Sequence, residues 1–385
     1  MKVALVHDQL REYGGAERVL EALAEIYPEA PIYTAFYQKG SIAWQQFKHR
    51  KLISSWAQYI PFFATKFHSP LRFLAPWIWE SFDFSQYDVV ISSASWYITK
   101  GFGTRGTSFS KPIEICYCHT PPRWLYGYQT SVEWQRFWPV KVYAAVVGYF
   151  MRMYDFSAAQ KVNYFIANSE EVKGRIKKFY RREATVIYPP ATLSFTRQAG
   201  SSVPLTKREY YFIVSRIVGA KGLDLAVKAA EKLGFKLKIA GVPAGYYGEH
   251  TKLQKMAKNN VEFLGHVTDE ELVKLYSGAK AFLALARDED FGITPVEAMS
   301  CGTPVIAYHG GGYKETVVDG KTGIFFHQLT VESLTAAIKK FETLQVAQGK
   351  KISEDCRKQA AKFSKERFKR EVAVFVEQKV EKQHA

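Results

Sequence analysis

Cysteine is scarce in this chain, and the spacing of its thiols excludes the commonest metal sites. The 385 residues contain four cysteines, Cys116, Cys118, Cys301 and Cys356. No Cys-x-x-Cys pair and no group of histidines accompanies them, so a structural zinc site is not indicated. We expect the thiols to act as small apolar side chains in a reducing compartment.

Long apolar runs are also missing. The longest candidate, residues 142–151, is interrupted by Gly148 and bounded by Lys141 and Arg152. It falls short of the ~18 residues that a membrane-spanning helix requires. The amino-terminal apolar run is too short for a signal peptide and turns polar at Asp8. These absences favour a cytoplasmic protein.

Positive charge, in contrast, is in excess. The chain carries 53 Lys and Arg against 37 Asp and Glu, a formal net charge of +16. Such a field favours anionic partners, among them nucleotides, phospholipid headgroups and nucleic acid. The length suits two domains, and a hydrophobic content of 47% permits ordinary cores.

Apolar strand-like runs alternate with helical patterns along the chain. The first, residues 3–6, leads into a loop with Gly14 and Gly15 and then a helical apolar face. The two glycines do not form Gly-x-Gly-x-x-Gly, so a dinucleotide site is not indicated. They allow either a plain tight turn or close approach of a ligand to the backbone. The polar segment 199–204 has the composition of a linker between two α/β domains.

The most informative stretch is 286–303, Ala-Arg-Asp-Glu-Asp-Phe-Gly-Ile-Thr-Pro-Val-Glu-Ala-Met-Ser-Cys-Gly-Thr. It predicts a polar turn after a buried strand at 279–286, followed by a helix at about 294–300 that ends at Gly302. Seven residues separate Glu289 from Glu297, and both could project into one crevice beside the helix amino terminus. Such a terminus is a ready anion site, although carboxylates there can also simply complement the helix dipole.

This stretch resembles the Glu-x7-Glu signature of glycosyltransferase family 4, and the resemblance extends in order over nearly the whole chain. It implies an α/β GT-B fold with two Rossmann-like, doubly wound domains facing a central cleft. Residues 1–195 would form an acceptor-binding domain, completed by a carboxyl-terminal helix at about 364–385. Residues 205–363 would bind the nucleotide-sugar donor.

The resemblance implies donor-binding roles for residues of the second domain. Arg216 and Lys221, five apart on a strand-to-helix loop, would hold the distal phosphate and stabilise the departing diphosphate. Glu289 would position sugar hydroxyls, and Glu297 would bind the ribose. The remaining donor contacts implied are Gly265 and Val267 at the base, and Phe291, Gly292, Ile293 and Thr294 at the helix start.

In the first domain the resemblance places Gly14 and Gly15 beside the donor phosphates, with Gly15 also near the acceptor. His119, which follows a strand at 113–117, would face the donor sugar, and Arg123 would hold the acceptor. A lone histidine at a strand end is more often structural. The catalytic group implied is therefore His119, Glu289, Arg216 and Lys221. No metal and no cofactor is expected, since the nucleotide sugar is a substrate.

Residues 48–82 are unusually rich in aromatic and basic side chains, including Trp56, Phe62, Lys66 and Trp77. Three interpretations stay open: a core packed against the sheet, contact with an anionic membrane or lipid acceptor, or stacking on single-stranded nucleic acid. The last is the weakest, and we expect no nucleic-acid partner. Peripheral attachment at the inner face of the cell membrane follows from the second.

The sequence thus predicts a retaining glycosyltransferase that moves a hexose from a nucleoside-diphosphate sugar to a glycan or lipid-linked acceptor. Mannose from GDP-mannose is the best guess by analogy. Two alternatives remain: a related sugar-nucleotide epimerase or phosphorylase, and a catalytically silent, membrane-associated scaffold of a glycan assembly complex.

Overall fold

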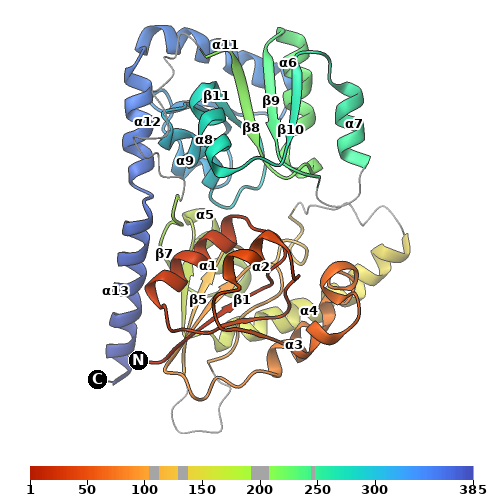
Figure 1. Cartoon of the computed structure of the whole chain (residues 1–385), viewed down its shortest axis with the longest axis vertical. Helices are drawn as coiled ribbons and strands as arrows, with labels where there is room; N and C mark the ends of the chain where they lie inside the picture. The colour runs from red at the N-terminus through yellow and green to blue at the C-terminus, as the bar shows by residue number, and fades with distance from the viewer. Residues whose placement is uncertain (104–111, 129–137, 192–207, 244–247, 385) are drawn as a thin grey trace. The chain divides into compact units, whose positions relative to one another are not determined.

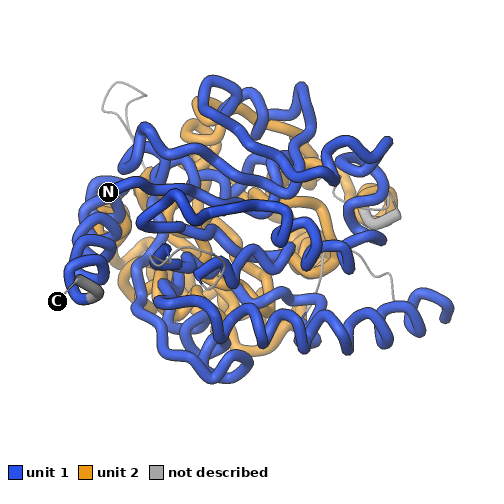
Figure 2. Tube along the Cα trace, turned by 90° about the horizontal axis from the view of Figure 1, so that it is seen from below, with its two compact units in different colours: residues 1–128, 134–190, 365–385 blue, residues 129–133, 191–364 orange. Residues whose placement is uncertain are grey.

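The structure is a computed structural model, and it describes residues 1–103, 112–128, 138–191, 208–243 and 248–384. The chain divides into two compact units (Figures 1 and 2). Unit 1 comprises residues 1–128, 134–190 and 365–385, and unit 2 comprises residues 129–133 and 191–364. The expected linker at 199–204 lies outside the described residues.

Unit 1 is built on a parallel sheet of seven strands in the order β3-β2-β1-β4-β5-β6-β7. The strands are β1 (Val3–His7), β2 (Ile32–Thr34), β3 (Leu52–Ser54), β4 (Val89–Ala94), β5 (Ile113–Cys118), β6 (Tyr164–Ala167) and β7 (Ala184–Val186). Its α-helices are α1 (Gly15–Ile26), α2 (Ile42–Phe47), α3 (Ala75–Glu80), α4 (Trp138–Lys161), α5 (Glu170–Tyr180) and α13 (Lys365–His384). Short turns of helix, η1 (Trp56–Tyr59), η2 (Phe63–Phe67) and η3 (Arg72–Leu74), precede α3.

Hydrophobic cores lie on both faces of this sheet. Alternate residues of β1 enter different cores, since Leu5 packs with α1 and α13 while Val6 packs with α3 and α4. The stripe of α13, formed by Phe368, Val372, Phe375 and Val376, is buried in the first of these cores. The last helix is therefore part of the packing of unit 1, although residues 191–364 of unit 2 come before it in the chain.

Unit 2 has a six-stranded parallel sheet in the order β10-β9-β8-β11-β12-β13. Its strands are β8 (Tyr210–Val214), β9 (Lys236–Ala240), β10 (Val261–Gly265), β11 (Ala279–Ala284), β12 (Val305–Tyr308) and β13 (Gly323–Phe326). Its helices are η6 (Gly219–Lys221), α6 (Leu223–Leu233), α7 (Gly248–Met256), α8 (Asp269–Gly278), α9 (Ile293–Ser300), α10 (Tyr313–Thr316), α11 (Val331–Gln348) and α12 (Lys351–Ala361). The sequence pattern predicts a strand at 210–214 and a helix at 223–233, and both are confirmed to the residue.

In each sheet the strand order reverses at one place, between β1 and β4 in unit 1 and between β8 and β11 in unit 2. Open α/β sheets bind ligands at the carboxyl ends of the strands at this switch point. The polar loops that follow these four strands are therefore the places to look for function.

All four cysteines are buried free thiols, in keeping with the apolar role expected. Within the residues that the structure describes, no helix is long and apolar enough to cross a membrane. The 48–82 segment divides: Phe63, Ile78 and Trp79 are core, whereas Tyr59 and Trp77 are exposed. Core packing thus accounts for only part of its aromatic content.

Candidate functional site

The loops after β8 and β11 bring two of the expected donor residues together in unit 2. Lys221 ends the η6 turn, and its Nζ lies 2.8 Å from Oε2 of Glu289. The Tyr313 hydroxyl lies 3.4 Å from the same oxygen. Both members of the pair are partly exposed, so an incoming anion can compete with the carboxylate for the ammonium. Arg216 is exposed on the same loop, between β8 and η6.

Glu297 has different surroundings from Glu289. It lies inside α9, and its side chain is 3% exposed. Its carboxylate accepts a hydrogen bond of 3.1 Å from the Tyr276 hydroxyl on α8. The two acids are therefore different in kind, because Glu289 faces a cation at the surface and Glu297 faces a buried phenol.

The turn before α9 has the geometry that its glycine predicts. Gly292 has φ +91°, and a Cβ there would come within 2.9 Å of the Tyr313 ring. Phe291 is buried against Phe363, with ring centroids 5.3 Å apart. Ile293 and Thr294 follow as the first residues of α9, which begins one residue earlier than expected.

The three glycines at 310–312 meet the backbone of the signature stretch. A Cβ on Gly311 would lie 2.2 Å from the Glu289 carbonyl oxygen, and one on Gly312 would lie 2.4 Å from Cα of Phe291. The Gly312 N–H also donates to the Glu289 carbonyl at 2.9 Å. The loop after β12 thus holds the backbone of Glu289 in place, which only glycines can do at this distance.

The expected base-binding residues lie where the loops after β8, β9 and β10 converge. Gly265 has φ +67°, and its carbonyl accepts a 2.7 Å hydrogen bond from the Gly241 N–H. A Cβ on Gly241 would collide with the Ser215 carbonyl. Val267 follows on the same loop and is half-buried.

Asp288 and Asp290 flank Glu289 and have the Asp-x-Asp spacing of many metal sites. Among the described residues, however, no group of three or more His, Cys, Asp or Glu is placed to hold a metal ion.

The switch point of unit 1 holds a chain of hydrogen bonds that sequence reasoning largely missed. In the register of β1 and β4, His7 lies opposite Ser93. His7 Nδ1 is 3.0 Å from Ser93 Oγ, and Ser93 Oγ is 2.8 Å from Nε2 of His119. At the other end, His7 Nε2 faces Glu17 of α1 at 3.4 Å. The sequence does show a polar residue at or near the end of each strand, namely His7 on β1, Ser93 on β4 and His119 after β5.

The direction of these hydrogen bonds depends on the tautomer of His7. When His7 carries its hydrogen on Nε2, it donates to Glu17 and accepts at Nδ1 from the Ser93 hydroxyl. Ser93 then accepts from His119, whose Nε2 carries the hydrogen and whose Nδ1 is an acceptor. Burial, and then the neighbouring His7, lower the pKa of His119 to about 3, so the ring is neutral at pH 7.

The Gly14-Gly15 loop is tied to the same chain. Gly14 precedes α1, and its N–H donates to Oε2 of Glu17 at 2.8 Å. Gly15 is the first residue of the helix. Glu17 therefore joins the backbone of this loop to His7.

Two more polar residues fix loops around this switch point. Buried Asp8 accepts from the N–H of Trp96 at 2.6 Å and from the Thr99 hydroxyl. Arg175 of α5, which is 3% exposed, donates to the Thr120 hydroxyl beside His119 at 3.1 Å. Arg123, the expected acceptor residue, is half-buried on the following turn.

Comparison with known proteins gives a family match for most of unit 2. Residues 195–363 match the family model described as "Glycosyl transferases group 1". A D-inositol 3-phosphate glycosyltransferase of Mycobacteroides abscessus is 36% identical over 158 residues, which are 39% of this chain and 35% of that protein. A GDP-mannose-dependent alpha-(1-6)-phosphatidylinositol monomannoside mannosyltransferase of Mycolicibacterium smegmatis is 34% identical over 149 residues, 35% of this chain and 38% of that protein. The chain spans less than half the length of these relatives.

Solved structures resemble the chain over almost its full length. A sucrose-phosphate synthase from Thermosynechococcus elongatus has a TM-score of 0.76 at 18% identity and covers 98% of this chain and 99% of its own. Anabaena HepE, solved in complex with UDP-glucose, has a TM-score of 0.71 at 18% identity, with 98% and 100% covered. The two Rossmann-like units of this chain therefore have the fold of the GT-B glycosyltransferases, and unit 2 carries the match to the group 1 glycosyl transferases.

Proposed function

We propose that this protein is a glycosyltransferase that moves a hexose from a nucleoside-diphosphate sugar to a glycan or lipid-linked acceptor. The observation that carries the proposal is the Lys221–Glu289 pair at the switch point of unit 2, inside the segment that matches the group 1 glycosyl transferases. A cation held by a partly exposed carboxylate is poised to exchange that partner for a phosphate.

In this proposal Lys221 and Arg216 bind the donor diphosphate and stabilise the charge that develops as it departs. Once Lys221 moves to the phosphate, Glu289 is released to accept hydrogen bonds from sugar hydroxyls. Glu297 binds the ribose, and its bond to Tyr276 fixes its orientation. His119 contributes a neutral ring, and Arg123 contributes to acceptor binding.

Mannose is our proposed sugar and GDP-mannose the proposed donor, with retention of the anomeric configuration. A relative named as GDP-mannose-dependent supports this choice. Fold neighbours solved with UDP and UDP-glucose make uridine donors the alternative to test.

Thermal unfolding with a panel of GDP-, UDP- and ADP-sugars, with and without Mg²⁺, tests the donor site. A ligand at 100 times its dissociation constant should add roughly 2.7 kcal/mol to the free energy of unfolding. We expect one nucleotide family to stabilise the wild type and the Lys232→Met control, but not Lys221→Met. Lys232 is an exposed lysine on α6 that pairs with Glu332.

No stabilisation by any sugar nucleotide would contradict the proposal and favour the silent scaffold. Stabilisation accompanied by isomerisation of the free sugar nucleotide, without transfer, would instead favour an epimerase.

A further inference from the structure

An exposed apolar stripe runs along α4 of unit 1. Its members recur every three or four residues, the spacing of one helix face: Trp138, Val142, Val146, Tyr149 and Met153, with Phe150 beside them. Trp138 is 75% exposed and Phe150 is 63% exposed. A surface helix normally has polar residues on its solvent-facing side. The solvent-facing side of α4 is apolar instead.

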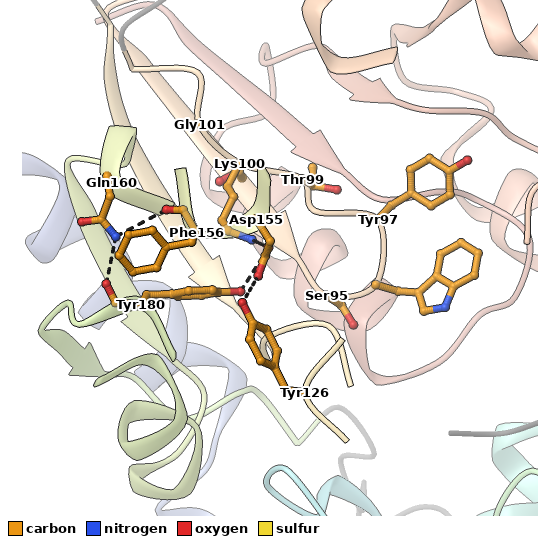
Figure 3. A network of polar contacts seen from close by, with 12 residues as sticks. Ser95, Tyr97, Thr99, Lys100, Gly101, Tyr126, Asp155, Phe156, Gln160 and Tyr180 are labelled. Carbon is orange, nitrogen blue, oxygen red and sulfur yellow. Dashed lines mark hydrogen bonds and ion pairs between the residues drawn. The ribbon is translucent and has the colours of Figure 1, made fainter. Parts of the chain in front are cut away.

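The opposite face of α4 is fixed in the core, so the exposed stripe is not a core face left unpacked. Asp155 is fully buried and pairs with Lys100 (Figure 3). The same carboxylate accepts from the Tyr126 hydroxyl at 2.7 Å and from the Tyr180 hydroxyl at 3.3 Å. Rotating α4 to bury its stripe would expose or break this pair.

A second group of exposed aromatics lies on residues 56–77 of the same unit: Trp56, Tyr59, Phe62, Phe67 and Trp77. Phe62 has a left-handed backbone, with φ 60°, which is unfavourable for a bulky residue. Its ring is nevertheless 64% exposed, and Lys66 Nζ lies 5.4 Å from its centroid.

Contacts join the two groups. The Tyr143 hydroxyl of α4 donates to the Pro70 carbonyl, and Met151 of α4 shares a core with Phe63. We call the exposed residues of α4 and of 56–77 together the apolar surface.

Within residues 56–77 and along the exposed stripe of α4, the charged side chains are positive. Residues 56–77 contain no Asp or Glu, and their cations are Lys66 and Arg72. On α4 the exposed ionisable residues at the stripe are Lys141 and Arg152, while Asp155 is buried. Exposed rings with interleaved cations match an anionic bilayer interface, where rings lie at headgroup level and cations meet lipid phosphates. The exposed Glu80 at the end of α3 lies just beyond this segment.

We propose that the apolar surface docks unit 1 on an anionic lipid bilayer, with α4 lying in the plane of the interface. The proposal stands on the packing and charge of unit 1 and does not require the glycosyl transfer proposed above. If both hold, docking brings unit 1 to the place where a lipid-linked acceptor resides.

Flotation of the full chain with vesicles of phosphatidylcholine, with and without phosphatidylglycerol, tests this docking. We expect binding to the phosphatidylglycerol vesicles that weakens as salt rises. Val146→Glu with Phe150→Glu should weaken it at least about tenfold, because each carboxylate removes an apolar contact and repels the lipid. Val346→Glu with Val374→Glu is the matched control, since both valines are exposed elsewhere, and it should bind as the wild type does.

Absence of wild-type binding to either vesicle at low salt would overturn the proposal, as would equal loss in the control. A change in the oligomeric state of the Val146→Glu, Phe150→Glu variant without any vesicle binding would also overturn it, and would show that a second copy covers the surface. Thermal stabilisation by the donor panel reports separately on unit 2 and should be the same in all three proteins.

Discussion

At the scale of single residues, His119 makes a prediction about pH. Its pKa is lowered to about 3 by burial and by His7, whereas in the unfolded chain a histidine titrates near 6.5. Between these values the unfolded state binds one more proton than the native state at this site. Stability is therefore fully present above pH ~6.5 and is lost as pH falls towards 3, at up to about 1.4 kcal/mol per pH unit.

Urea unfolding of wild type and His119→Gln from neutral to mildly acid pH measures this contribution. For each protein, the slope of the free energy of unfolding against pH gives the number of protons taken up on unfolding. The wild type should take up close to one proton more than His119→Gln. His309→Gln is the control, because His309 is exposed, and its slope should match that of the wild type. Parallel slopes for wild type and His119→Gln would show that His119 is not buried as a neutral ring.

At the scale of elements, the loop after β12 supports the signature stretch through backbone contact. Gly312→Ala places a Cβ 2.4 Å from Phe291 Cα, so either loop 289–291 or loop 310–312 must move. We expect this variant to lose a few kcal/mol of stability and most of its donor binding, as measured by denaturation and by ligand-induced thermal shift.

Gly174→Ala on α5 is the matched substitution. A Cβ at Gly174 meets nothing within 4 Å, and alanine in a helix interior is favoured over glycine by roughly 0.5–1 kcal/mol. This control should be more stable than the wild type and bind donor normally. Unchanged donor binding in the Gly312→Ala variant would show that loop 310–312 does not support the donor site.

At the scale of the whole molecule, the end of the chain completes a core that its beginning starts. Phe368 of α13 is fully buried among residues of β1, β5 and α1. Phe368→Ala should cost about 3–5 kcal/mol in the unfolding of unit 1. Val374→Ala, on the exposed side of the same helix, should cost little. Equal effects in a urea titration would mean that α13 does not pack on unit 1.

The sequence by itself determined the local structure of this protein. A continuous apolar run predicted the strand at 210–214, and helical spacing of apolar residues predicted the helix at 223–233. Gly292 and Pro295 located the start of α9 within one residue. These features could be predicted from a single sequence because they depend on the local propensity and spacing of neighbouring residues. The family resemblance identified Lys221 and Glu289 as candidate site residues, because the motifs that contain them occur in the same order as in the family.

Tertiary structure decided which distant side chains meet. His7, Ser93 and His119 form one hydrogen-bonded chain only because the sheet order places β1, β4 and β5 side by side. The same holds for Lys100 and Asp155, which no motif connects. It also decided which aromatics of 48–82 enter the core and which stay exposed, since burial depends on the helices that pack there. Sheet order and packing bring together residues far apart in the chain, and spacing along the sequence does not encode that pairing.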